Sequence, residues 1–126
     1  MRVLVDTSVW IAHFRQRNDA LAALLEADRV LMHPMVLGEI ACGTPPQRTA
    51  LLRDLADLAP ASQATVGEVI AFLDREQLYD RGCGLVDLTL LASTILTPEA
   101  VLWTLDRRLA DMAEALGVLY LAVPLH

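Results

Sequence analysis

Short apolar runs alternate along this chain with longer segments in which apolar residues recur at helical spacing. The runs are rich in Val and Leu, which predicts strands at residues 2–5, 30–32, 101–104 and 118–121. The segments between and after them carry apolar residues at i, i+3 and i+4, which predicts helices beginning near residues 8, 19, 34, 45, 66, 86 and 107. Strands that alternate with helices favour an α/β fold, a mostly parallel sheet flanked by helices.

Polar and proline residues mark the expected helix ends. Asn18 or Asp19 can cap the second helix, and Thr65–Glu68 has the form of a capping box. Thr44–Gln47 has the same form with proline at the first helical position, and Pro60 should end the helix that follows.

The composition is that of a folded protein of one domain. The chain has 126 residues, of which 55% are hydrophobic and 21% charged, with no linker or repeat, so residues 1–126 are expected to form one domain. No apolar run of membrane-spanning length is free of charge, and the first residues lack the cleavage pattern of a signal peptide. A cytoplasmic protein without membrane contact is therefore expected.

Several kinds of chemistry find little support. Cys42 and Cys83 fit neither a disulfide framework nor a zinc pattern, and His13, His33 and His126 are isolated, so a non-catalytic role is expected for each histidine. The chain contains no lysine, which excludes P-loop chemistry and any mechanism that needs a catalytic ammonium.

Four carboxylates stand out because each interrupts or ends an apolar run: Asp6, Glu39, Asp87 and Asp106. Asp6 and Asp106 follow predicted strands, and ligands of parallel α/β folds bind outside the carboxyl ends of the strands. Asp87 lies near a helix start and Glu39 within a helix that follows a strand, so all four can reach one cleft. Unpaired buried carboxylates are costly, and a hard divalent cation is the ligand that several of them would share.

Each of these acids also has a simpler interpretation. Asp6 and Asp106 could be helix N-caps, and Asp87 could be an acid favoured by the helix dipole. Glu39 is harder to explain in this way because it lies in mid-helix, at the edge of an apolar face. The net charge of −6 by itself argues against a nucleic-acid partner, but bound Mg²⁺ would reverse the local field.

Four motifs, in order and spread over the whole chain, resemble those of the PIN-domain ribonucleases, and more narrowly of the VapC toxins of type II toxin–antitoxin modules. They are Asp6-Thr7-Ser8-Val9-Trp10-Ile11, Val36-Leu37-Gly38-Glu39-Ile40, Gly84-Leu85-Val86-Asp87 with Leu91-Ala92-Ser93, and Leu102-Trp103-Thr104-Leu105-Asp106-Arg107-Arg108-Leu109.

The resemblance implies a single PIN-like domain that hydrolyses RNA with Mg²⁺, or Mn²⁺, held by the four acids. Ser8 and Thr104 match polar accessory positions of the same motifs. Many PIN domains have another acid shortly after the fourth, whereas Arg107 and Arg108 stand here, so one tightly held ion is expected. These two arginines are candidates to contact RNA phosphates. The resemblance also implies a homodimer and a VapB-like antitoxin that fills the acidic cleft.

Three alternative functions fit the sequence less well. A receiver-type phosphoacceptor and a haloacid-dehalogenase-type phosphatase each need a lysine, and the phosphatase needs Asp-x-Asp where this chain has Asp6-Thr7-Ser8. A non-catalytic PIN-like module that binds RNA or protein remains open. The intact set of four acids argues against it, and a metal-dependent nuclease assay separates the two.

Overall fold

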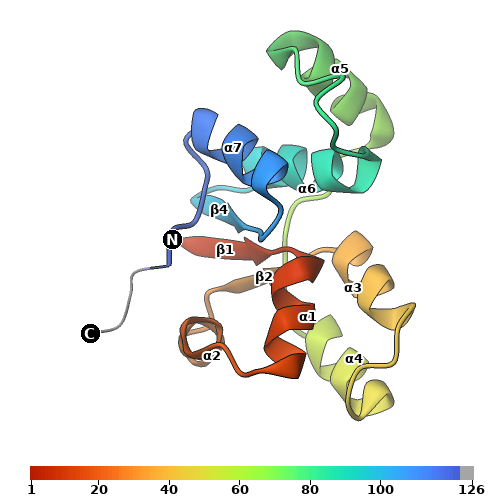
Figure 1. Cartoon of the computed structure of the whole chain (residues 1–126), viewed down its shortest axis with the longest axis vertical. Coiled ribbons are helices and arrows are strands. Elements are labelled where there is room, and N and C mark those ends of the chain that lie inside the picture. The colour runs from red at the N-terminus through yellow and green to blue at the C-terminus, as the bar shows by residue number, and fades with distance from the viewer. Residues whose placement is uncertain (123–126) are drawn as a thin grey trace.

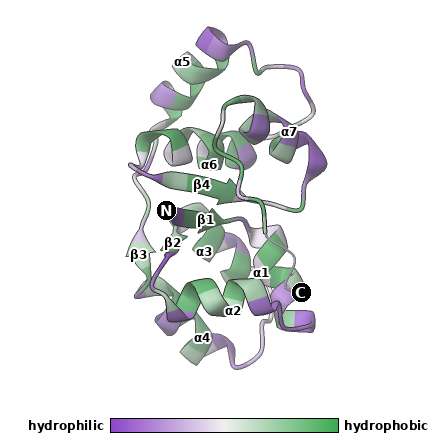
Figure 2. Ribbon diagram, turned by 90° about the vertical axis from the view of Figure 1, so that its left-hand side faces the viewer, coloured by the Kyte–Doolittle hydropathy of each residue, from purple (hydrophilic) through white to green (hydrophobic). Residues whose placement is uncertain are grey.

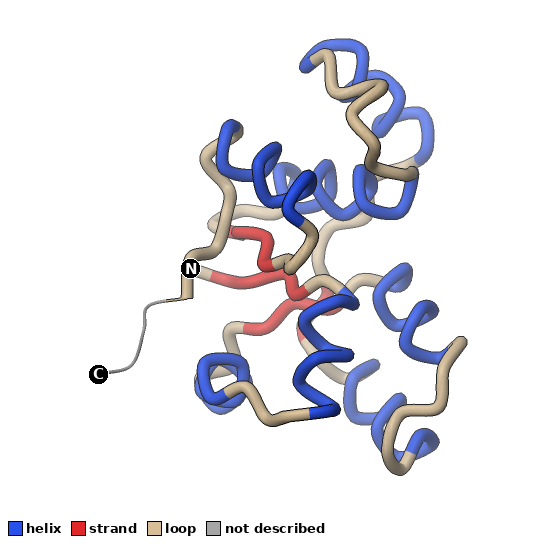
Figure 3. Tube along the Cα trace, in the orientation of Figure 1, coloured by secondary structure: helices blue, strands red, loops and turns tan. Residues whose placement is uncertain are grey.

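The computed structural model describes residues 1–122; residues 123–126, which include His126, lie outside the described part of the chain. A sheet of four parallel strands forms its centre, in the order β3-β2-β1-β4. The strands are β1 (Arg2–Val5), β2 (Val30–Met32), β3 (Ala59–Pro60) and β4 (Ala100–Trp103). Figure 3 shows them as a central layer between two groups of helices, which confirms the expected α/β fold.

The helices divide between the two faces of the sheet. Figure 1 shows α1 to α4 on one side and α5 to α7 on the other. Their bounds are α1 (Thr7–Arg15), α2 (Asp19–Glu26), α3 (Pro34–Ala41), α4 (Arg48–Ala56), α5 (Val66–Glu76), α6 (Leu85–Leu96) and α7 (Arg107–Ala115). Among these described helices, none is both long and apolar enough to cross a bilayer.

Helix α6 is the most deeply buried helix, because it lies between the sheet and the helices α5 and α7. All residues from Leu88 to Thr94 are buried, which is why the segment is apolar almost all round (Figure 2). Its buried threonines satisfy their hydroxyls locally: Thr94 Oγ1 donates to the Leu90 carbonyl at 2.8 Å. The rest of the core is aliphatic, with Val3, Leu4 and Leu102 of the central strands completely buried.

The helix starts agree with the expected caps in two cases and differ in a third. The Asn18 side chain accepts from Leu21 N, and Thr65 and Glu68 form the full capping box. The box expected at Thr44–Gln47 does not form: α4 begins at Arg48, and Gln47 has no side-chain cap bond. The prediction was wrong because Pro45 precedes another proline, and a residue before proline is disfavoured in helical conformation.

Two strand assignments also differ. The segment 118–121, predicted as a strand, pairs with β4 through one isolated bridge between Leu102 and Leu119. Conversely, α4 ends at Ala56 rather than continuing to Pro60, and Ala59–Pro60 forms the short strand β3. Proline is tolerated there because β3 is at the edge of the sheet.

The chain connections create a switch point at the carboxyl edge of the sheet. After β1 the chain turns to one face of the sheet, and after the neighbouring β4 it turns to the other (Figure 1). Ligands of open parallel sheets bind at such a switch point. The two aspartates that follow these strands, Asp6 and Asp106, therefore stand on either side of it.

Candidate metal and RNA site

Asp6 is the buried centre of the site, with 6% of its surface exposed. It is the N-cap of α1, and its Oδ1 accepts from Thr7 N at 2.8 Å. The N-cap interpretation is therefore confirmed, but it does not account for the other oxygen. Its Oδ2 accepts two further hydrogen bonds, from the hydroxyls of Ser8 and Thr104, each at 2.8 Å. Such donors compensate the burial of the carboxylate and fix the direction of its oxygens.

Thr104 ties the ends of β1 and β4 together. The last residues of the two strands, Val5 and Trp103, are in register, and Asp6 N donates to the Trp103 carbonyl at 2.9 Å. Thr104 Oγ1 donates to Asp6 and also accepts from Asp106 N at 3.0 Å. The two positions predicted as accessory, Ser8 and Thr104, thus both contact Asp6 directly.

Asp106 is the N-cap of α7, and its Oδ1 accepts from Leu109 N at 3.0 Å. Unlike Asp6, it is exposed to solvent. Ser8 links the loop before it to the centre of the site, because Leu105 N donates to Ser8 Oγ at 3.1 Å. Asp106 is therefore a helix cap that is also bonded, through Thr104, to the centre of the site.

Glu39 lies exposed in the middle of α3. Its Oε1 accepts a hydrogen bond of 2.7 Å from Thr7 Oγ1, which brings it to the start of α1. No helix-capping role accounts for this contact. Thr7 is a contributor that the sequence analysis did not single out. Its only signal was its place directly after Asp6, since the partner is 32 residues away.

Asp87 shows most clearly that the acids share one environment. It lies in the first turn of α6, partly buried. Burial raises the pKa of this carboxyl, and the negative charges of Asp6, Asp106 and Glu39, in that order, raise its pKa further, while the Gly84 N–H acts in the opposite direction. The first-turn position alone would favour a charged acid. The charges of the other three predicted acids therefore act on the carboxyl of Asp87.

The neighbouring charges do not neutralise one another. In residues 1–122 the ion pairs are Arg17–Asp19 and Arg75–Glu76, and neither involves the four acids. Within the same range, no three Asp, Glu, His or Cys side chains are packed tightly enough to form a preassembled metal cage. The four acids are thus linked by their charges, without a metal cage preformed among the described residues.

The two arginines after Asp106 differ from each other, although both are exposed. Arg108 Nη1 donates to the Gly82 carbonyl at 3.3 Å, and a Cβ on Gly82 would lie only 2.5 Å from that nitrogen. Arg108 therefore covers the loop before α6. The side chain of Arg107 forms no hydrogen bond or ion pair with the other described residues.

Cys83 lies within reach of the charges of two of the acids. Burial raises the pKa of its thiol, and the charges of Asp106 and Asp87 raise the pKa further, whereas Arg108 lowers it. A thiol in this setting stays protonated and is a poor ligand or nucleophile.

Comparison with known proteins gives a consistent answer. The sequence matches the PIN domain family over residues 3–115. Ribonuclease VapC32 of Mycobacterium tuberculosis, from strains CDC 1551 / Oshkosh and ATCC 25618 / H37Rv, is 42% identical over 116 residues, covering 92% of this chain and 94% of the relative. The fold is similar to a solved structure of VapBC-1 from nontypeable Haemophilus influenzae. That match has a TM-score of 0.59 and 19% identity over 88% of this chain and 94% of the other.

The family match covers nearly all of the described chain and includes all four acids and the strands that position them. The parallel sheet agrees with the sequence match and with the structural likeness. This protein belongs to the PIN domain family.

Proposed function

We propose that this protein is a metal-dependent endoribonuclease and the toxin of a type II toxin–antitoxin system. The observation that carries the proposal is the gathering of Asp6, Glu39, Asp87 and Asp106 at one edge of the sheet without a basic partner among the described residues. Like charges at close range oppose one another, and a divalent cation is the partner that would compensate them. The 42% identical relative is named a ribonuclease and a VapC protein, which supports the same activity here.

The donor chemistry suits Mg²⁺ or Mn²⁺, because all four side chains offer carboxylate oxygen. Both oxygens of Asp6 already accept hydrogen bonds, whereas Glu39 and Asp106 each keep one oxygen that accepts none from the described residues. Hydrogen bonds within the described residues occupy one oxygen each of Glu39 and Asp106, which leaves Glu39 Oε2 and Asp106 Oδ2 for a ligand. When bound, the ion would activate a water and stabilise charge on the phosphoryl oxygens.

The chain's own residues have distinct parts in this proposal. Ser8 and Thr104 orient the Asp6 carboxylate, and Thr7 orients Glu39. Arg107, exposed directly after Asp106, would contact an RNA phosphate. Arg108 would also contact a phosphate while its guanidinium stays bonded to the Gly82 carbonyl.

The proposal also includes the location, the oligomeric state and the partner of the protein. Residues 1–126 form one nuclease domain that acts in the cytoplasm as a homodimer. A VapB-like antitoxin fills the acidic cleft with a basic side chain, since an arginine can pair with the carboxylates that otherwise hold metal. The name of the structural neighbour, VapBC-1, supports a partner of this kind.

RNA cleavage tests the enzymatic part. Wild-type protein should cleave RNA with Mg²⁺ or Mn²⁺ and not with EDTA. Asp6→Asn should lower the rate more than about 100-fold, because changes to groups that merely support a metal ligand already cost roughly 10–100-fold. Asp54→Asn, at an exposed position of α4, is the matched control and should be fully active. Full activity of Asp6→Asn would refute the proposed site, and absence of cleavage by wild type with any metal would favour a binding module.

Glu39→Gln tests whether Glu39 is a metal ligand. The amide keeps an oxygen that can accept from Thr7, so the fold should be unchanged, but the loss of charge should weaken Mn²⁺ binding about tenfold or more. Isothermal titration calorimetry with Mn²⁺ measures this affinity. Glu114→Gln, exposed on α7, is the control. Equal affinities of wild type and Glu39→Gln would leave a site of three acids.

Asp87→Asn should make the metal-free protein more stable at neutral pH. The folded-state pKa of Asp87 is raised, so its protonated form is favoured on folding, and that contribution is lost as the pH rises through the folded pKa. The stability gain of the variant should therefore be absent near pH 3, appear above about pH 4 and level off at higher pH. Urea unfolding in EDTA across this range measures it. No gain at pH 7 would show that the acids do not repel one another appreciably.

Expression in bacteria tests the biological role. This chain alone should arrest growth, and co-expression of the small gene encoded beside it should restore growth. Asp87→Asn alone should be harmless, with immunoblotting to show equal protein levels. If wild type is as harmless as Asp87→Asn without any partner, the toxin role is wrong, although a nuclease with another role would remain.

A further inference from the structure

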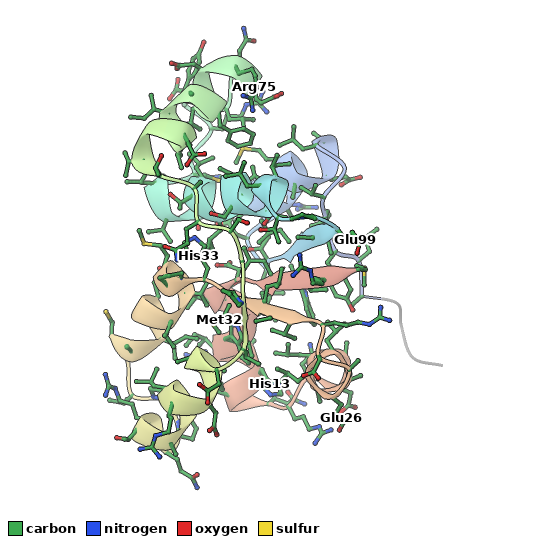
Figure 4. The ribbon with its side chains drawn as sticks, turned by 180° about the vertical axis from the view of Figure 1, so that it is seen from behind. His13, Glu26, Met32, His33, Arg75 and Glu99 are labelled. Carbon is green, nitrogen blue, oxygen red and sulfur yellow. The ribbon has the colours of Figure 1, made fainter. Side chains whose placement is uncertain are left out.

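His33 is a buried polar residue that the proposed chemistry does not use, with only 2% of its surface exposed. It follows β2 and is the N-cap of α3, where its Nδ1 accepts from Met35 N at 3.0 Å. On the other side of the ring, Nε2 lies 3.1 Å from Ser93 Oγ of α6. Figure 4 shows His33 between the start of α3 and helix α6.

These contacts determine the state of the ring. A backbone N–H can only donate, so Nδ1 must carry a lone pair, and the proton of the neutral ring is on Nε2. Nε2–H therefore donates to Ser93 Oγ. Burial lowers the pKa of His33, which favours the same neutral form.

Ser93 is a fixed anchor for this bond. Its side chain is completely buried, and its Oγ also accepts from Ala64 N at 3.1 Å. One turn further along α6, Thr97 Oγ1 donates to the Ser93 carbonyl and accepts from Ser62 N. The segment before α5 and the start of α3 are thus fastened to the same side of α6.

The position of this bond relative to the acids is informative. His33 is six residues before Glu39, and Ser93 is six residues after Asp87. Each acid is therefore about 9 Å along its helix from the bond, at a rise of about 1.5 Å per residue. Because the bond joins the start of α3 to α6, it constrains the two helices that carry these acids.

We infer that the His33–Ser93 hydrogen bond is the joint that fixes α3 against α6 and so sets the spacing between Glu39 and Asp87. Both residues are positioning residues: they contact no substrate and act through the two acid-bearing helices. The consequence for metal binding rests on the proposed function, whereas the consequence for helix spacing does not.

Three variants isolate the joint. Ser93→Ala removes the acceptor of this bond and also the acceptor of Ala64 N, so His33→Asn is the more selective change. His33→Asn keeps an N-cap, because Asn is a preferred capping residue at the extended backbone of His33, but its side chain is too short to replace Nε2. Thr94→Val is the control: it also removes a buried hydroxyl from α6, but one that bonds only within that helix.

Two readouts are measured on each folded variant. Double electron–electron resonance measures the distance between two spin labels and so reports helix spacing without metal. One label is on Cys42, at the end of α3, and the other is on Ile95→Cys, exposed on α6, in a Cys83→Ser background. Mn²⁺ titration then reports the affinity of the acids.

Ser93→Ala and His33→Asn should each shift or broaden the distance distribution and weaken Mn²⁺ binding about tenfold, and Thr94→Val should change neither. If Ser93→Ala does not fold, His33→Asn alone decides. An unchanged distance distribution, or an equal change in Thr94→Val, overturns the joint. If wild type fails to bind Mn²⁺, the proposed function fails, and the distance distributions still decide the inference.

Discussion

The hydrogen bonds to the buried carboxylate of Asp6 hold together the part of the fold where the chain changes faces. Thr7 N, Ser8 Oγ and Thr104 Oγ1 donate to it, and they come from the start of α1 and from the end of β4. An acid at 6% exposure without these donors would be strongly destabilising. The same bonds leave Asp6 rigid at the switch point of the sheet, so the group that organises the site also organises the strand ends around it.

Asp87 is placed at a cost in stability. Asp87 feels the negative charges of Asp6, Asp106 and Glu39, which raise its pKa, and the ion pairs of the described residues lie elsewhere. Away from the acids, the His33–Ser93 hydrogen bond links the start of α3 to α6. A domain that keeps such charges together is suited to bind a cation at the moment of function rather than to be most stable without one.

Much of this arrangement was predictable because local signals determine it. Apolar runs and capping residues such as Asn18 and Thr65 placed most strands and helices, and acids after strands placed Asp6 and Asp106 at one edge. The contacts that hold the site join distant segments and have no local signal. Thr7 meets Glu39 across 32 residues and His33 meets Ser93 across 60. The Thr44 capping box failed because the steric effect of consecutive prolines outweighed a favourable pattern.

Whether one divalent ion binds among the four acids is the central question, and anomalous X-ray diffraction from crystals soaked in Mn²⁺ answers it most directly. One anomalous peak is expected near the ends of β1 and β4, in contact with oxygens of Asp6 and Asp87 and of at least one of the other two acids. The peak should be absent from crystals of Asp87→Asn grown and soaked in the same way. Ordered density for all four carboxylates with no peak among them, or a peak bound elsewhere on the protein, would contradict it.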